Sequence, residues 1–307
     1  STLPYPAKFA FQGAAITPLP FVTMTHRCLL VQFLQRGVPK NLLFNPTDIE
    51  GARATPFFAR LSAQFGQTVT KALAKAFDPL EEQLARHGIA PEDVDYVAFD
   101  HFHTQDLRRL LGTATAPPRF PNATLLAPRR EWEEWDDLHP MQRAWFVPGG
   151  RAGVRTDKVA LTTGDLALGD GVMLLRTPGH TVGNQTLFVC TDGGVWGVSE
   201  NGTSADNWSP LESRIRGIKS TARALDLEVI INANTPELAA EQYTSMILER
   251  TLVDRVRRAP AFVQMFPSSE VTPNVLAPGL SPALLHRAIT SGEVVRPAPR
   301  ARVEAAE

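Results

Sequence analysis

The chain has 307 residues, of which 43% are hydrophobic and 21% are charged, which is sufficient to bury a large core. Its 31 lysines and arginines balance 32 aspartates and glutamates, and the net charge of −1 excludes the basic footprint of a nucleic-acid or anionic-membrane protein. No stretch approaches the roughly 18 consecutive apolar residues of a membrane span, and no charged-then-apolar leader opens the chain. We therefore expect a cytoplasmic protein with a small-molecule substrate and no nucleic-acid or membrane partner.

Apolar runs and helix-end signals predict alternating strands and helices in the first third of the chain. Residues 21–34 hold apolar stretches interrupted by Thr25-His26-Arg27, which predicts two paired strands with His26 in the turn between them. Residues 78–88 carry the start and stop signals of a helix. A strand is expected over 94–99, and 107–111 predicts a short helix whose N-terminus can face an anionic group.

Residues 113–155 interrupt this alternation with several prolines and tryptophans. Trp132 and Trp135 have a helical i, i+3 spacing, and we expect them to pack one helix onto the core. The sequence leaves two roles open for Trp145 and Phe146: packing in the core, or contact with an apolar or aromatic substrate.

The second half of the chain predicts further strands and one long helix. Residues 172–176 and 195–198 form apolar strand-like runs, and the Asp-Gly content of 191–194 predicts a hairpin turn before the second run. Residues 227–231 predict another strand. An amphipathic helix is expected from Thr235-Pro236-Glu237 to about residue 257. Its apolar positions include Leu238, Ile247 and Leu252.

Polar side chains follow these predicted strands at the points where the strands end. His101 and His103 follow 94–99, His180 follows 172–176, Glu200 follows 195–198, and Asn234 follows 227–231. In sheets covered by helices, ligands collect beyond the strand ends. Two histidines one residue apart, joined by a third from a distant loop, form the three-nitrogen face that a catalytic zinc or iron commonly takes. The alternative is that the histidines are ordinary polar residues at strand exits and turns.

These motifs carry a family resemblance. From about Phe9 to Arg250 the chain resembles the metallo-β-lactamase-fold superfamily of metallohydrolases, whose pattern is His-x-His-x-Asp-His, a later Thr-Pro-Gly-His turn, an Asp after a hairpin and a last His. The resemblance implies an α/β fold, a four-layer αββα sandwich, which we place in residues 1–258. Residues 259–307 are then a C-terminal extension, partly disordered or packed on the domain or on a partner such as a second copy in a homo-oligomer.

The resemblance also assigns ligands. His101, His103 and His180 match the first metal site without alteration, whereas the second-site positions differ. Gln105 stands in place of the Asp, Asp106 in place of the His, Glu200 near the bridging Asp, and Asn234 in place of the last His. An all-oxygen set of this kind suits a hard cation such as Mn, Mg or Ca. We predict one metal per chain, zinc first, with Fe or Mn as alternatives.

The predicted activity is hydrolysis of an ester, lactone, thioester or amide by a metal-bound hydroxide. Asp106 is the predicted catalytic residue, which orients the water or moves its proton, and Glu200 is either a fourth ligand or a second base. One alternative is a mononuclear non-haem iron oxygenase, with His101, His180 and Glu200 as ligands. Another is a binding protein that catalyses nothing.

Overall fold

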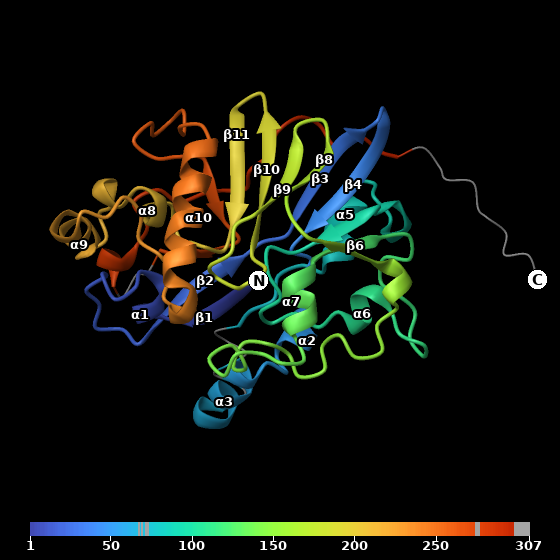
Figure 1. The fold of residues 1–307 in the computed structure, drawn as a ribbon, viewed down its shortest axis with the longest axis horizontal. Helices are drawn as coiled ribbons and strands as arrows, with labels where there is room; N and C mark the ends of the chain where they lie inside the picture. The colour runs from blue at the N-terminus through green and yellow to red at the C-terminus, as the bar shows by residue number, and fades with distance from the viewer. Residues whose placement is uncertain (67, 69, 71–73, 274–276, 298–307) are drawn as a thin grey trace, which may run out of the picture.

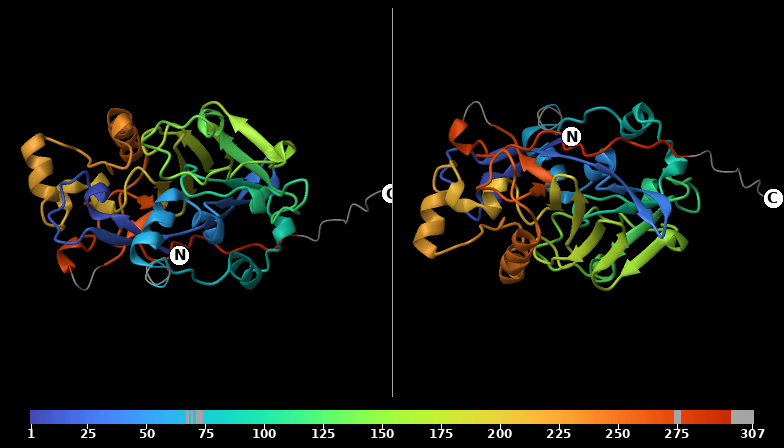
Figure 2. Two further views of the ribbon diagram at one scale, coloured as in Figure 1. Left: turned by 90° about the horizontal axis from the view of Figure 1, so that it is seen from below. Right: turned by 90° about the horizontal axis from the view of Figure 1, so that it is seen from above.

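The computed structural model describes residues 1–66, 68, 70, 74–273 and 277–297. Two five-stranded sheets pack face to face, with helices against their outer faces (Figure 1). Figure 2 shows these layers from two other sides, with the blue strands of one sheet and the yellow-green strands of the other lying apart. A third sheet of three strands contains the N-terminal strands.

The first sheet is mixed, with one antiparallel pair followed by parallel strands. Its order is β3 (Leu29–Gln35), β4 (Val38–Phe44), β5 (Tyr96–Ala98), β6 (Thr124–Pro128) and β7 (Val159–Thr162). The second sheet has the order β12 (Met265–Pro267), β11 (Gly194–Ser199), β10 (Gln185–Thr191), β9 (Val172–Arg176) and β8 (Leu166–Gly169). The third sheet has the order β1 (Thr2–Pro6), β2 (Phe21–His26) and β13 (Ser269–Val271).

The side chains between the two large sheets explain why they stack. Alternate residues along a strand point to the same face of its sheet. Val31, Phe33 and Phe44 of the first sheet therefore meet Leu187 and Phe266 of the second in one buried cluster.

Helices cover both outer faces of this sandwich. In the described part of the chain the α-helices, not all of which lie on these faces, are α1 (Ala7–Ala10), α2 (Ile49–Ala52), α3 (Pro56–Phe65), α5 (Leu80–Arg86), α6 (Arg108–Leu111), α7 (Arg129–Glu134), α8 (Ala205–Trp208), α9 (Ile218–Leu225) and α10 (Ala239–Leu252). Leu84 of α5, Leu110 of α6 and Trp132 of α7 pack on the first sheet. Trp208 of α8 and Met246 of α10 pack on the second. The predicted αββα order of layers is confirmed, as is the packing of Trp132 and Trp135 in the core.

Two strand predictions were wrong. Residues 227–231 form no strand, although Val229, Ile230 and Ile231 are buried, and the backbone N–H and C=O of Ile230 both hydrogen-bond Asn207, at 2.8 and 2.7 Å. The strand that pairs with β11 at the edge of the second sheet is β12, which runs parallel to β11. The expected pair within 21–34 is also absent from the described residues. There, β2 pairs with β1 and β13, whereas β3 pairs with β4, so His26 is the last residue of β2 and not a turn residue.

Helix α10 differs from its prediction in length and in the face that it buries. It ends at Leu252, five residues before the expected end at 257, and Leu252 is 43% exposed. The face that is buried is largely polar, with Gln242, Ser245 and Glu249 at the helical spacing of one side. These polar side chains hydrogen-bond the loops that leave β9 and β11.

Part of the segment after residue 258 is integrated into the sheets. It supplies β12 to the second sheet and β13 to the third. The buried carboxylate of Glu270 pairs with Arg27 at 2.9 Å and with the ring of His286 at 2.7 Å, which fixes the following chain on the domain. Residues 298–307 of the predicted extension lie outside the described residues. Within the described part of the chain, no helix combines the length and the apolar character needed to cross a membrane.

Candidate metal centre

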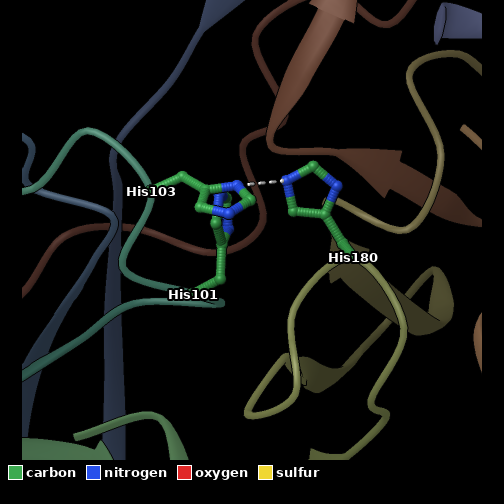
Figure 3. A group of neighbouring side chains, drawn as sticks. All are labelled: His101, His103 and His180. Atoms are coloured by element: carbon green, nitrogen blue, oxygen red, sulfur yellow. Dashed lines mark hydrogen bonds between the residues drawn. The ribbon is translucent and has the colours of Figure 1, made fainter. Parts of the chain in front are cut away.

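Three histidine side chains from two loops meet at one point. His101 and His103 lie in the loop after β5, and His180 lies in the loop after β9. Figure 3 shows the three rings turned toward one another. One ring nitrogen from each lies within 4.8 Å of the other two, and among the described residues this is the one group of three His, Cys, Asp or Glu side chains so placed.

Hydrogen bonds fix the proton of His103 on the nitrogen that points away from the group. Its Nε2 lies 2.6 Å from Oε1 of Gln142, and Nε2 of Gln142 donates to Glu237 at 2.6 Å. A carboxylate can only accept, so the Gln142 amide must present its oxygen to His103. His103 Nε2 therefore carries the proton, and the lone pair of Nδ1 points toward His180.

The same logic applies to His180. Its Nδ1 lies 3.2 Å from Oδ1 of Asn232, whose Nδ2 donates to the backbone oxygen of Glu200 at 2.7 Å. Nδ1 of His180 therefore carries the proton. Its bare Nε2 faces the bare Nδ1 of His103 at 3.1 Å. Two lone pairs at this distance repel each other unless a cation lies between them.

His101 completes the donor set. Its Nδ1 lies 2.6 Å from Oδ1 of Asp100, which leaves Nε2 free. Burial and the charge of neighbouring His101 hold the pKa of His103 well below its usual value and lower that of His180 to about 3. Imidazoles bind metal only in the neutral form. The neutral rings of His103 and His180, together with Nε2 of His101, form a three-nitrogen set that fits a divalent metal such as zinc.

Asp100 is itself held in place by the end of β4 and by the turn before β13. Asn45 donates to its Oδ2 at 3.0 Å, and the hydroxyl of Ser268 donates to the same oxygen. Burial acts to raise the pKa of Asp100, but the charge of His101 and these hydrogen bonds bring the pKa below its ordinary value. Asp100 is therefore the ionised partner that orients His101.

A buried carboxylate in α7 links the two histidine loops. Oε1 of Glu131 accepts from the backbone N–H of Phe102 at 2.7 Å, and Oε2 accepts from the hydroxyl of Thr181 at 2.9 Å. Burial raises the pKa of Glu131 to about 7. Glu131 is not predicted from the sequence, because its charged neighbours are typical of a solvent-exposed helix.

The Thr-Pro-Gly-His turn needs its glycine. Gly179 has a φ of +153°, and a Cβ there would lie 2.3 Å from Cα of Gln242 in α10. The turn is also held by Ser245, whose hydroxyl donates to the oxygen of Pro178 at 2.6 Å. The polar face of α10 thus sets the position of His180.

The other predicted site residues lie around this centre. Glu200 accepts from the backbone N–H of Ser269 at 2.8 Å, and its carboxylate is not part of the 4.8 Å group. Nε2 of Gln105 donates to Thr47 at 3.0 Å and to the backbone oxygen of His103 at 3.2 Å. Nδ2 of Asn234 lies 3.4 Å from Nδ1 of His103, and its Oδ1 has no hydrogen-bond partner among the described residues.

The carboxylate of Asp106 is paired with Arg108. Its carboxylate forms a two-point ion pair with the guanidinium of Arg108 and accepts from the backbone N–H of Arg108 at 3.1 Å. The first backbone N–H of α6 thus contacts a carboxylate of its own chain.

A cavity of about 360 Å³ opens over the three histidines. Its polar end also contains Glu200 and Asn234. Its remaining wall is mainly apolar, formed by Leu3, Met24, Ile49, Phe57, Phe58 and Trp145. Trp145, whose role the sequence left open, lies with its ring centre 6.2 Å from that of His103.

Two polar residues of this cavity, Tyr5 and His26, were not predicted as site residues. Nε2 of His26 lies 2.9 Å from the hydroxyl of Thr47, and Nδ1 lies 3.2 Å from the hydroxyl of Ser269. Burial lowers the pKa of His26 to about 4, so the ring is neutral at pH 7. No local pattern identifies either residue, because both reach the cavity through the pairing of β2 with β1 and β13.

No protein-family model matches the chain. The N-acyl homoserine lactonase AttM of Azorhizobium caulinodans is 33% identical over 117 residues, which are 35% of this chain and 40% of AttM. An N-acyl homoserine lactonase of Bacillus cereus is 24% identical over 186 residues, which are 59% of this chain and 64% of that protein. The chain thus spans less than two thirds of the length of these curated relatives.

The fold has a clear likeness among solved structures. AidC, described as a dizinc quorum-quenching lactonase in complex with the product N-hexanoyl-L-homoserine, superposes with a TM-score of 0.56 at 13% identity. The match covers 94% of this chain and 92% of AidC. The chain therefore has the predicted metallo-β-lactamase fold, with two mixed sheets and flanking helices.

Proposed function

We propose that this protein is a metal-dependent hydrolase that opens lactones, with N-acyl homoserine lactones as the first substrates to test. The observation that carries the proposal is the convergence of three histidine ring nitrogens at the polar end of a largely apolar cavity. The lactonase activity of both sequence relatives and of AidC supports the choice of substrate.

His101, His103 and His180 would hold one zinc ion. Zinc is supported by the dizinc centre of AidC and by the three-nitrogen donor set. A zinc ion bound in this way lowers the pKa of a bound water and polarises a carbonyl oxygen, which is the chemistry that lactone hydrolysis needs. Asp100, Gln142 and Asn232 keep the three rings in their ligand tautomers.

The cavity determines how a substrate lies. Its volume of about 360 Å³ is in the range of small-molecule sites. An apolar acyl chain would contact Phe57, Phe58 and Trp145, and the lactone ring would lie at the histidines. Glu200 would act there as a fourth ligand or as a second base. The assignment of Asp106 as catalytic residue stays a prediction, and its ion pair with Arg108 makes a direct test necessary.

The test combines elemental analysis of protein purified without added metal or chelator with an assay of N-hexanoyl homoserine lactone opening. We expect about one zinc per chain and hydrolysis in the native protein. His103→Ala should lose both, and His87→Ala, at an exposed helix end, should keep both. A protein without metal and without hydrolysis would contradict the proposal.

Other results of these measurements would assign the site a different metal content or a different activity. Two metals per chain would bring Gln105, Asp106 and Asn234 into a second metal site. Iron together with oxygen uptake would favour the oxygenase. An Asp106→Asn protein that retains its metal and full activity would remove Asp106 from the catalytic residues.

A further inference from the structure

The hydroxyl group of Thr47 lies at the wall of the histidine cavity. Thr47 is in the loop between β4 and α2, is half-buried, and lines the cavity together with Gln105 and His26. Nε2 of Gln105 donates to the Thr47 hydroxyl at 3.0 Å and to the backbone oxygen of His103 at 3.2 Å. The Gln105 amide therefore fixes this hydroxyl beside the loop that carries His103.

The ring of His26 supplies a second donor to the same oxygen. Its Nε2 lies 2.9 Å from the Thr47 hydroxyl and 3.4 Å from the backbone oxygen of Asn45, which can only accept. A proton on Nε2 satisfies both contacts, whereas a bare Nε2 would face the lone pairs of the carbonyl. The hydroxyl of Ser269, 3.2 Å from Nδ1, then donates to the other ring nitrogen.

These two donors leave the Thr47 hydroxyl with one unused hydrogen. A threonine hydroxyl has two acceptor lone pairs and one hydrogen to donate. Gln105 and His26 occupy the lone pairs, and no group in the described part of the chain accepts the hydrogen. Thr47 thus presents an oriented O–H donor at the cavity wall.

The position of this donor relative to the apolar wall indicates which group it binds. Ile49, Phe57 and Phe58, which follow Thr47 in the chain, form much of that wall, and the histidines form the polar end. A lactone with its carbonyl at the histidines and its side chain along Phe57 and Phe58 would pass Thr47 where the side chain leaves the ring. An alkyl side chain has no acceptor at this point, whereas an acylamino side chain has an amide oxygen.

We infer that Thr47 selects lactones whose side chain carries an acceptor oxygen close to the ring, because its hydroxyl donates a hydrogen bond to that oxygen. This inference rests on the proposed hydrolase function and adds a specificity-determining residue to it. The side-chain oxygen gains no charge during ring opening, so the hydrogen bond stabilises the bound substrate and the transition state equally. Its loss should raise KM and leave kcat almost unchanged.

The test is Thr47→Val, which keeps the shape of the side chain and removes the hydroxyl. Thr70→Val is the matched control, because Thr70 also lines the cavity but its hydroxyl already donates to the backbone oxygen of Gly66 at 3.1 Å. The probes are N-hexanoyl homoserine lactone and α-hexyl-γ-butyrolactone, which carries its chain on the same ring carbon and has no oxygen in that chain. If the alkyl lactone is not hydrolysed, its inhibition constant replaces KM.

For Thr47→Val we expect KM for N-hexanoyl homoserine lactone to rise about 3- to 10-fold, and KM for the alkyl lactone to rise less than about twofold. The metal content should stay at the native value. Thr47→Ser, which keeps the hydroxyl, should restore the native KM. Thr70→Val should keep the native ratio of the two KM values.

Three results would overturn the inference. The first is a KM of Thr47→Val for N-hexanoyl homoserine lactone within about twofold of the native value. The second is an equal rise for both lactones, which would mean that valine disturbs the His103 loop. The third is a rise in Thr47→Ser as large as in Thr47→Val. If the native protein hydrolyses N-hexanoyl homoserine lactone in these cases, the proposed function stands and only the role of Thr47 fails. If the metal-loaded native protein hydrolyses no lactone, both fail.

Discussion

Gln142 decides which nitrogen of His103 faces the metal position. Its oxygen accepts the proton of Nε2 at 2.6 Å, and Glu237 holds the amide in that orientation. In Gln142→Ala this buried N–H loses its acceptor, so the ring is free to rotate or to change tautomer. We expect zinc affinity to fall about 10- to 100-fold, measured by competition with a chelator. Gln83→Ala, which removes a contact with Asp78 on the surface, should leave affinity unchanged. Equal affinities in both variants would show that Gln142 does not orient His103.

Helix α10 acts on the site through the turn that it contacts. Gly179 touches the helix so closely that an added Cβ would lie 2.3 Å from Cα of Gln242. Gly179→Ala should therefore destabilise the protein by about 2 kcal/mol or more and weaken metal binding, because the turn that carries His180 must shift. Urea unfolding and chelator competition measure the two effects. Gly153→Ala is the control, since Gly153 also has a positive φ, +67°, but a Cβ added there would meet no atom within 4 Å. A loss in Gly179→Ala no larger than in the control would mean that backbone strain alone is responsible.

A metal held by the three histidines would join the two halves of the sandwich. His101 and His103 follow β5 of the first sheet, and His180 follows β9 of the second. Because the unfolded chain does not hold the three rings together, metal binding should stabilise the fold. At a free zinc concentration about 1,000 times Kd the gain is about 4 kcal/mol, visible as a higher unfolding midpoint than in the chelator-treated protein. His103→Ala should show no zinc-dependent shift. A native protein with the same midpoint with and without zinc would contradict a bound metal at this site.

Residue order alone predicted the strands at 172–176 and 195–198 and the polar residues His180 and Glu200 that follow them. Both are local signals: an apolar run reports that a segment is buried, and a polar residue directly after it lies at the strand end. The strand at 172–176 and the hairpin at 191–194 were predicted correctly for this reason.

Only the tertiary structure decided which segments pair and which distant side chains meet. An apolar run does not specify which strand it pairs with. Residues 227–231 match a strand pattern, but residues 265–267 form the strand that pairs with β11. The buried polar face of α10 is stabilised by hydrogen bonds with the loops after β9 and β11. The helical periodicity of the sequence gives no information about those loops. His103 and His180 lie 77 residues apart in the chain, and Tyr5 and His26 reach their cavity only because β2 lies between β1 and β13. Such contacts depend on hydrogen bonds between backbone segments far apart in sequence, and residue order alone does not encode them locally.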